Sequence, residues 1–200
     1  MQGGIKRTID LALSAALLVL LAPLLLLIAL AVKCSDGGSI LYRQTRVGLD
    51  GRRFTIIKFR TMHENAERGL GAVWSVPGDP RCTAIGYCLR RSGFDELPQL
   101  WNVFRGDMSL VGPRPERPEF TCEFRGEYPS YDLRHNVRAG LTGYAQIHGW
   151  RGCTSVRERL RHDLHYVRNW SLRLDLFILA MTPIRGWSER TRSGITAGAS

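Results

Sequence analysis

The sequence of 200 residues predicts an α-rich α+β protein that is attached to a membrane through its N-terminal segment. The apolar run at residues 11–32 contains one polar residue, Ser14, and is interrupted at Pro23. A second observation is the hairpin pattern at residues 40–59, and a third is the helical spacing of apolar side chains at residues 156–167. These patterns favour helices around a small β-hairpin, some of them amphipathic and suited to a membrane interface.

The apolar run at residues 11–32 is long enough to cross a bilayer, which needs about 20 residues. Pro23 lies near its middle, removes a backbone hydrogen bond and is expected to bend the helix. Lys6 and Arg7 precede the run and Lys33 follows it, so a single span would carry one basic flank across the membrane, against the positive-inside rule. Two interpretations stay open: a re-entrant helix that enters and leaves by one leaflet, and a kinked helix that spans.

We expect the membrane segment to occupy residues 1–36 and one folded domain to occupy residues 37–188. The pair Asp50-Gly51 is typical of a tight turn and predicts the hairpin. The tail at residues 189–200 is small and polar and is expected to be disordered. The other expected elements are strands at 40–47 and 53–59, helices at 64–70, 83–91 and 156–167, a loop at 77–80 and a short apolar segment at 174–181.

The chain carries 28 basic and 18 acidic residues, and its net charge of +10 suits an anionic partner. Nucleic acid, an anionic membrane leaflet and a diphosphate substrate all fit that description. The sequence argues against nucleic acid, since it lacks zinc-finger spacing and RNP-like aromatic motifs. Five scattered cysteines without a Cys-x-x-Cys pair predict reduced thiols. His162 and His165 have no third ligand nearby and predict no metal site.

Two adjacent carboxylates, Asp95 and Glu96, precede Pro98 at the predicted start of a helix. Ordinary capping explains such a pair, because carboxylates are stabilised by the free N–H groups of a helix start. Phosphoryl transfer explains it as well, with one carboxylate attacking phosphorus and the other binding a divalent cation. Arg114, between two prolines, and Arg90, one helix earlier, supply guanidinium groups that suit phosphate.

Apolar side chains follow the two carboxylates at helical spacing. They fit packing in the core and equally an apolar face in a lipid interface, so both possibilities stay open. These positions are Leu97, Leu100, Trp101 and Phe104.

Three classes of protein fit these features. The first is an enzyme that handles a phosphorylated substrate at a bilayer surface. The second is a membrane-anchored basic nucleic-acid-binding module, and the third is a scaffold in which Asp95 and Glu96 only cap a helix. The sequence argues against a fourth class, a glycosyltransferase that binds its metal through Asp-x-Asp, because it contains no Asp-x-Asp and that class leaves the apolar run unexplained.

Short motifs in a fixed order cover residues 6–183 and decide among these classes. They are Lys6-Arg7-x-x-Asp10, Pro23 in the apolar run, Arg43-Gln44-Thr45-Arg46-Val47-Gly48, Lys58-Phe59-Arg60-Thr61-Met62, and the segments at 95–103, 106–115 and 140–146. In this order and spacing the chain resembles the bacterial sugar transferase family, the polyprenyl-phosphate phosphoglycosyl transferases of the monotopic, single-domain kind.

The resemblance implies transfer of a sugar-1-phosphate from a UDP-sugar to undecaprenyl phosphate with release of UMP. This is the first membrane step of exopolysaccharide, O-antigen or capsule-type glycan synthesis. The family carries the phosphosugar on its aspartate, which implies that Asp95 is the nucleophile and that Glu96 helps to hold Mg²⁺. Residues implied to contact phosphate or the nucleotide sugar are Arg90, Arg114, Lys58, Arg60, Arg138 and Gln146.

The resemblance also implies a re-entrant helix broken at Pro23, with the catalytic domain on the cytoplasmic face of the bacterial inner membrane. The family breaks this helix at Ser-Pro, whereas this chain has Ala22-Pro23. The segments at 135–152 and 168–172 are similar to members that transfer glucose-1-phosphate or galactose-1-phosphate, so we expect a hexose rather than an N-acetylated amino sugar. Larger relatives carry extra membrane helices, which implies that this chain is the catalytic unit alone or a fragment.

Overall fold

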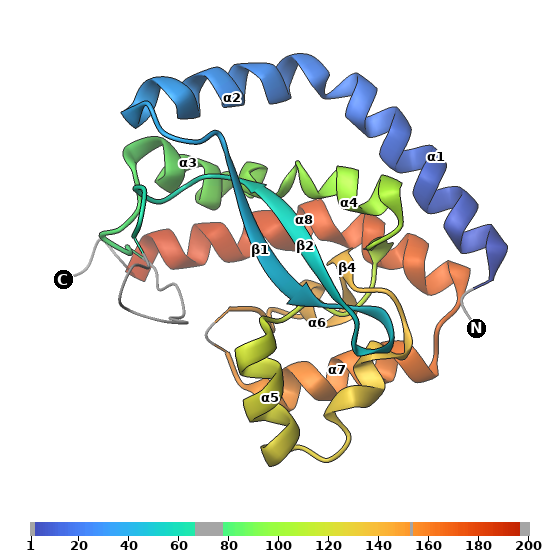
Figure 1. Ribbon diagram of the computed structural model, residues 1–200. Helices are drawn as coiled ribbons and strands as arrows, with labels where there is room; N and C mark the ends of the chain where they lie inside the picture. Colours follow the sequence, from blue (N-terminus) through green and yellow to red (C-terminus); the bar gives the residue numbers. More distant parts are fainter. Residues whose placement is uncertain (1–2, 67–77, 153, 197–200) are drawn as a thin grey trace.

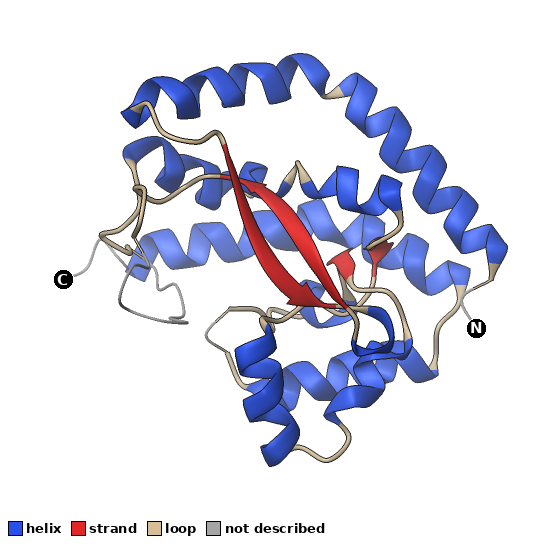
Figure 2. Ribbon diagram, viewed as in Figure 1, coloured by secondary structure: helices blue, strands red, loops and turns tan. Residues whose placement is uncertain are grey.

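The computed structural model describes residues 3–66, 78–152 and 154–196, and for residues 185–196 it describes the backbone alone. Helices dominate the fold, and a two-stranded hairpin runs between them (Figure 2). This confirms the prediction of an α-rich α+β protein with a small β-hairpin. Most of the helix predicted at 64–70 and the first residue of the loop predicted at 77–80 lie outside the described residues.

The N-terminal helices α1 (Gly4–Leu20) and α2 (Ala22–Asp36) form an arch along one side of the molecule (Figure 1). They are bent by 62° at a break that lies at Leu21, two residues before Pro23. Proline disturbs the turn before it, because it lacks an N–H and its ring crowds the carbonyl four residues earlier. Among the described residues no single helix is long and apolar enough to cross a membrane, whereas this bent pair is sufficient in length and composition.

The first limb of the arch is fastened to the folded domain by its polar residues. Lys6 Nζ donates to Asp175 Oδ2 at 2.6 Å, and Asp10 Oδ1 accepts the N–H of Leu110 at 3.0 Å. Arg7 donates to two main-chain carbonyls in the last turn of α4 (Gln99–Arg105), each at 2.6 Å. The basic residues before the apolar run therefore bind protein.

The second limb of the arch is fastened to the same domain at its far end. Asp36 pairs with the guanidinium of Arg60, and Val32 packs with Phe59 and Leu89. Between the two attachments the arch exposes apolar side chains, with Val19 78% and Leu20 72% exposed. Both ends of the arch thus lie on one folded body while its middle presents an apolar surface.

The hairpin joins β1 (Leu41–Val47) and β2 (Arg53–Phe59) in an antiparallel register from Leu41↔Phe59 to Val47↔Arg53. Its turn is the 3-10 helix η1 (Leu49–Gly51), in which Asp50 and Gly51 have φ of 54° and 73°. The predicted hairpin and its Asp-Gly turn are confirmed. A second pair was not predicted: β3 (Ser109–Val111) and β4 (Gly140–Thr142) run parallel and are three residues long.

Helices fill the rest of the described domain. The helix predicted at 83–91 is confirmed as α3 (Ala84–Ser92), whose cap residue Thr83 accepts the N–H of Gly86 at 2.9 Å. The helix predicted at 156–167 is confirmed as α7 (Val156–Arg168). The apolar segment at 174–181 lies in α8 (Leu172–Thr196). The remaining helical elements are η2 (Phe94–Glu96), α5 (Pro118–Glu127), η3 (Tyr131–Asn136) and α6 (Tyr144–Ile147).

The main core joins elements from both halves of the chain. Its buried members include Ile56 of β2, Val103 of α4 and Ile178 of α8. In α4, Leu100 is 2% exposed and belongs to this core, whereas Trp101 is 48% exposed. The helix therefore buries one face and presents another. The tail predicted at 189–200 stays a prediction: the described backbone of α8 continues to Thr196, and residues 197–200 lie outside the described part.

Candidate active site

The two candidate carboxylates lie in the short η2 segment that connects α3 to α4. Gly93 ends α3 with φ of 77°, and Pro98 begins α4, so Asp95 and Glu96 precede the helix instead of standing in its first turn. Among the described residues, neither helical start there carries a side-chain capping hydrogen bond. The pair therefore caps neither start through a side-chain hydrogen bond, and other contacts occupy Glu96.

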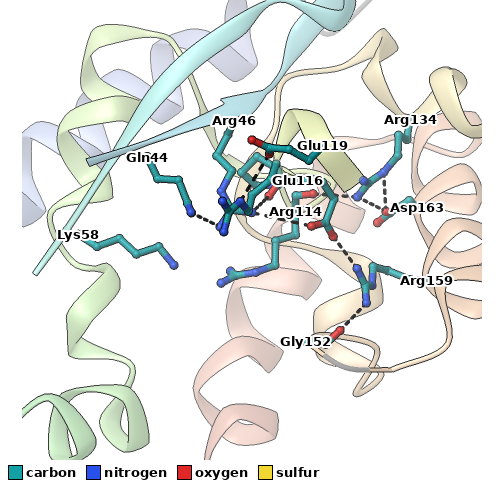
Figure 3. A network of polar contacts seen from close by, with 12 residues as sticks. Gln44, Arg46, Lys58, Arg114, Glu116, Glu119, Arg134, Gly152, Arg159 and Asp163 are labelled. Carbon is teal, nitrogen blue, oxygen red and sulfur yellow. Dashed lines mark hydrogen bonds and ion pairs between the residues drawn. The ribbon is translucent and has the colours of Figure 1, made fainter. Parts of the chain in front are cut away.

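Glu96 is held by two cationic side chains from separate parts of the fold. Arg114 Nη1 donates to Glu96 Oε2 at 3.0 Å, and Arg114 Nη2 donates to Oε1. Lys58 of β2 donates through Nζ to the same Oε1 at 2.6 Å. Figure 3 shows the side chains of Lys58 and Arg114 pointing toward each other across this space. The result is a partly buried carboxylate with two cations on one side of it.

The protonation of this cluster follows from burial and charge. Burial alone would raise the pKa of Glu96, but Arg114 and Lys58 outweigh it and hold that pKa well below its usual range. Burial lowers the pKa of Lys58, an effect that the charge of Glu96 opposes. The charge of Glu96 raises the pKa of Arg114. Glu96 is thus ionised at neutral pH and neutralised by its partners.

Asp95 has a different environment although it is the next residue. Its side chain is buried, at 9% exposure, and it makes no hydrogen bond or ion pair with the described residues. Burial, followed by the negative charge of Glu96, raises the pKa of Asp95 to about 6, although Lys58, Arg90 and Arg114 pull it back. Adjacent carboxyl groups with pKa values driven apart are typical of a division of chemical roles.

Arg90 completes the cluster from α3. Its Nε donates to Thr61 Oγ1 at 2.8 Å, and its charge lowers the pKa of Asp95. The structure therefore brings together Asp95, Glu96, Lys58, Arg90 and Arg114.

Three other predicted site residues lie in structural contacts outside this cluster. Arg60 pairs with Asp36 and fastens the arch. Arg138 donates to the carbonyl of Gly106 at 3.2 Å, and Gln146 donates to the carbonyl of Leu141 at 3.3 Å. None of these contacts among the described residues supports a place in the nucleotide-sugar pocket, and that role stays a prediction.

Behind Arg114 lies a network of buried ion pairs that the sequence analysis missed (Figure 3). Arg46 already belonged to a quoted motif, so its place beside the site had a signal in the sequence. The others come together from the loop before α5, from η3 and from α7, and share no local pattern. The network contains Arg46, Glu116, Arg134, Arg159 and Asp163.

A magnesium ion would find an incomplete protein site here. Among the described residues, no group of three His, Cys, Asp or Glu side chains could hold a metal. Mg²⁺ is commonly held by one or two carboxylates together with substrate phosphates, which is what this pair offers. Glu96 accepts three hydrogen bonds and retains about one free lone pair, while the oxygens of Asp95 are open. The residues fit the ion if a phosphorylated substrate supplies the other oxygens.

Comparison with known proteins places this geometry in a family. Residues 1–188 match the bacterial sugar transferase family. The chain belongs to that family.

Among the described residues, Cys34, Cys82, Cys88 and Cys122 form no disulfide, and Cys153 lies outside the described part. That the cysteines are reduced stays a prediction.

Relatives within the family are about two fifths identical to this chain over the aligned residues. The UDP-glucose:undecaprenyl-phosphate glucose-1-phosphate transferase of Escherichia coli is 43% identical over 93% of this chain and 41% of its own length. The UDP-N-acetylgalactosamine-undecaprenyl-phosphate N-acetylgalactosaminephosphotransferase of Aeromonas hydrophila is 42% identical over 89% of the chain and 42% of its own length. The exopolysaccharide production protein ExoY of Sinorhizobium fredii is 43% identical over 90% and 84%. The chain thus spans less than half the length of the first two relatives.

Proposed function

We propose that this chain transfers a sugar-1-phosphate from a UDP-sugar to undecaprenyl phosphate, releases UMP, and acts in exopolysaccharide-type glycan synthesis. The observation that carries the proposal is the environment of Asp95. This buried carboxylate makes no hydrogen bond or ion pair with the described residues, and it lies next to Glu96, which is bound by two cations. Asp95 is poised to react at neutral pH, because a pKa of about 6 still leaves most of it ionised and burial leaves the carboxylate poorly solvated. The names of relatives in the bacterial sugar transferase family supply the substrate class.

The proposed reaction has two steps at one phosphorus atom. A carboxylate oxygen of Asp95 bonds to the sugar-bearing phosphorus of the donor, and the bond from that phosphorus to the UMP oxygen breaks. A phosphate oxygen of undecaprenyl phosphate then bonds to the same phosphorus, and the Asp95 carboxylate leaves. The products are UMP and an undecaprenyl diphosphate sugar, and Asp95 is regenerated.

The cations around Asp95 have a defined task in this scheme. Lys58, Arg90 and Arg114 would neutralise the diphosphate oxygens, as arginine does well through its planar fork. A diphosphate that binds Lys58 and Arg114 takes over the partners of Glu96, so the Glu96 carboxylate becomes free to hold magnesium. The ion, when bound, supplies further charge neutralisation on the diphosphate.

The proposed membrane topology is re-entrant, with the N-terminus and the catalytic domain on the cytoplasmic face. Support comes from the two attachments of the arch, Lys6 to Asp175 at one end and Asp36 to Arg60 at the other. A spanning helix would have to break one of these two attachments. The exposed apolar side chains of the arch and of Trp101 would then meet the lipid.

The proposed donor carries a hexose, glucose or galactose. The name of the E. coli relative specifies glucose-1-phosphate, whereas the name of the A. hydrophila relative specifies N-acetylgalactosamine, so family membership leaves both sugar types in play. The test is a panel of UDP-sugars incubated with undecaprenyl phosphate and scored for UMP. Release with UDP-glucose or UDP-galactose is expected; release with N-acetylated donors alone would reassign the sugar. Absence of UMP with every donor would refute the activity.

A further inference from the structure

The turn that carries Arg114 depends on donors from elsewhere in the fold. Pro113 and Pro115 flank Arg114, and proline has no N–H with which to anchor its own main chain. Four successive carbonyl groups of this turn accept hydrogen bonds from outside it. The pairs are Gly140 N with Pro113 O at 2.9 Å, Arg134 Nη2 with Arg114 O at 2.8 Å, Arg46 Nη1 with Pro115 O at 3.2 Å and Val47 N with Glu116 O at 3.0 Å.

Arg134 makes the contact that bears most directly on Arg114, because it bonds the carbonyl of that residue itself. Its Nε and Nη2 also donate to Asp163 Oδ2, at 3.0 and 2.6 Å, and its Nη1 donates to the Tyr131 hydroxyl at 2.8 Å. Arg134 and Asp163 are each 2% exposed. Figure 3 shows this pair on the far side of the turn from Lys58. Every nitrogen of the Arg134 guanidinium is therefore engaged in a buried site.

We propose that Arg134, held by Asp163, is a positioning residue that aims Arg114 at the carboxylate of Glu96. Arg114 contacts Glu96 through both of its Nη atoms, so a shift of its main chain disturbs two hydrogen bonds together. The effect on turnover rests on the proposed function, whereas the effect on the turn is independent of it. Arg134 acts through Arg114 and is not required to touch substrate.

The chemistry of the side chain explains why arginine is needed at this position. The planar guanidinium has five N–H donors in a fixed fork and serves Asp163, Tyr131 and the Arg114 carbonyl together. A lysine would keep the charge opposite Asp163 but has a single nitrogen to share among three acceptors. Arg134→Lys therefore removes the hydrogen bond to the carbonyl of Arg114 and still allows the ion pair with Asp163.

Tyr131→Phe is the matched control for Arg134→Lys. It removes one hydrogen bond from the same buried guanidinium and leaves the Arg114 carbonyl contact in place. The ring also remains, with the guanidinium carbon of Arg134 5.1 Å from its centroid. Any difference between the two variants in amide exchange or in kcat/KM then reports on the hydrogen bond that holds the turn.

The first measurement is amide hydrogen exchange by mass spectrometry on the full chain in detergent micelles. We expect the peptide at residues 110–118 to exchange roughly fivefold faster or more in Arg134→Lys than in Tyr131→Phe, as loss of a buried hydrogen bond predicts. Equal exchange in the two variants overturns the proposal. Should Arg134→Lys fail to fold, Asp163→Asn, which keeps the shape and loses the charge, takes its place under the same criterion.

The second measurement is kcat/KM for UMP release. Arg134→Lys is expected to lower it on the order of tenfold or more, as misplacement of a substrate-binding group does, and Tyr131→Phe to stay near the wild-type value. In an Arg114→Lys background the further loss from Arg134→Lys should nearly vanish, because both changes act on one contact. Multiplicative losses would overturn the proposal. Failure of the wild-type chain to release UMP would refute the proposed function, while the exchange comparison still decides the role of Arg134.

Discussion

The guanidinium of Arg114 meets both carboxylate oxygens of Glu96, although the two residues lie 18 positions apart in the sequence. This contact joins the turn after β3 to the segment before α4. It also neutralises the nearest negative charge to Asp95, so that Asp95 keeps an unpaired carboxylate in a buried setting. The reactivity proposed for Asp95 depends on this arrangement of its neighbours.

Asp95→Asn is expected to reduce UMP release by about 10⁴-fold or more, the range seen when a nucleophile or its direct partner is removed. The amide cannot form the proposed phosphosugar ester. The measurement is UMP formation from UDP-sugar and undecaprenyl phosphate, with circular dichroism as the control for folding. Substantial activity in a folded Asp95→Asn protein would contradict the covalent route.

The pH dependence of kcat/KM should show an acid limb near pH 6. The pKa of Asp95 is raised to about 6, and the reactive form is the ionised one, so the rate falls as pH drops through that value. Removing the negative charge in Glu96→Gln should shift this limb to lower pH, because that charge contributes to the raised pKa. A limb that stays fixed in Glu96→Gln would assign the titration to another group.

The same carboxyl should cost stability at neutral pH. A pKa raised from 3.8 to about 6 on folding gives a stabilisation that is complete below about pH 4 and lost as pH rises through about 6. Asp95→Asn should therefore raise Tm at pH 7.5. The free energy of unfolding is expected to rise by up to about 3 kcal/mol. The difference from wild type should shrink at pH 4.5. An equal change in Tm at both pH values would argue against a buried, charged Asp95.

Glu96→Gln is expected to weaken the magnesium dependence of the reaction. Loss of a carboxylate beside a metal typically reduces metal affinity by about tenfold or more, so the midpoint of a magnesium titration of UMP release should rise. Binding of Mg²⁺ to the donor alone sets the baseline for the comparison. A superimposable titration would leave Glu96 with the role the structure displays, the counter-ion of Lys58 and Arg114.

Re-entrant topology predicts that the N-terminus is inaccessible from the periplasm. A Gly3→Cys variant with the native cysteines replaced should resist a membrane-impermeant thiol reagent in intact cells and react after permeabilisation. The reason is that Lys6 and Arg7, a few residues later, bind the same domain that carries Asp95. Labelling in intact cells would show that the segment spans.

Local sequence signals predicted the elements that are defined locally. The Asp50-Gly51 pair gave the hairpin, because positive φ at two successive residues needs such a pair. Thr83 and Pro98 marked the starts of α3 and α4. Arg90 was proposed from the residues themselves and Lys58 from the resemblance to the family, and the structure places both beside Asp95 and Glu96.

Contacts between distant segments could not be predicted from the sequence, and the reason is physical. The strands β3 and β4 are three residues long, too short to show a strand period. Arg134 and Asp163 are charged residues of a kind that is usually exposed, and only the packing of η3 on α7 reveals that they are buried together. The pairing of Arg60 with Asp36, at the end of the arch, likewise joins segments 24 residues apart and has no signal in the local sequence.

The way the arch is fastened has a practical consequence for anyone preparing this protein. Leu17, Leu18 and Leu21 of the arch pack against the main core, and Arg7 satisfies the carbonyls that end α4. Deleting residues 1–36 would therefore remove the leucines that cover one side of the main core. It would also leave the last carbonyl groups of α4, the helix next to Asp95, without the hydrogen bonds from Arg7. The arch is a structural part of the folded domain as well as its proposed membrane anchor, so a water-soluble version has to be sought by altering its outward-facing leucines while its inward side is kept.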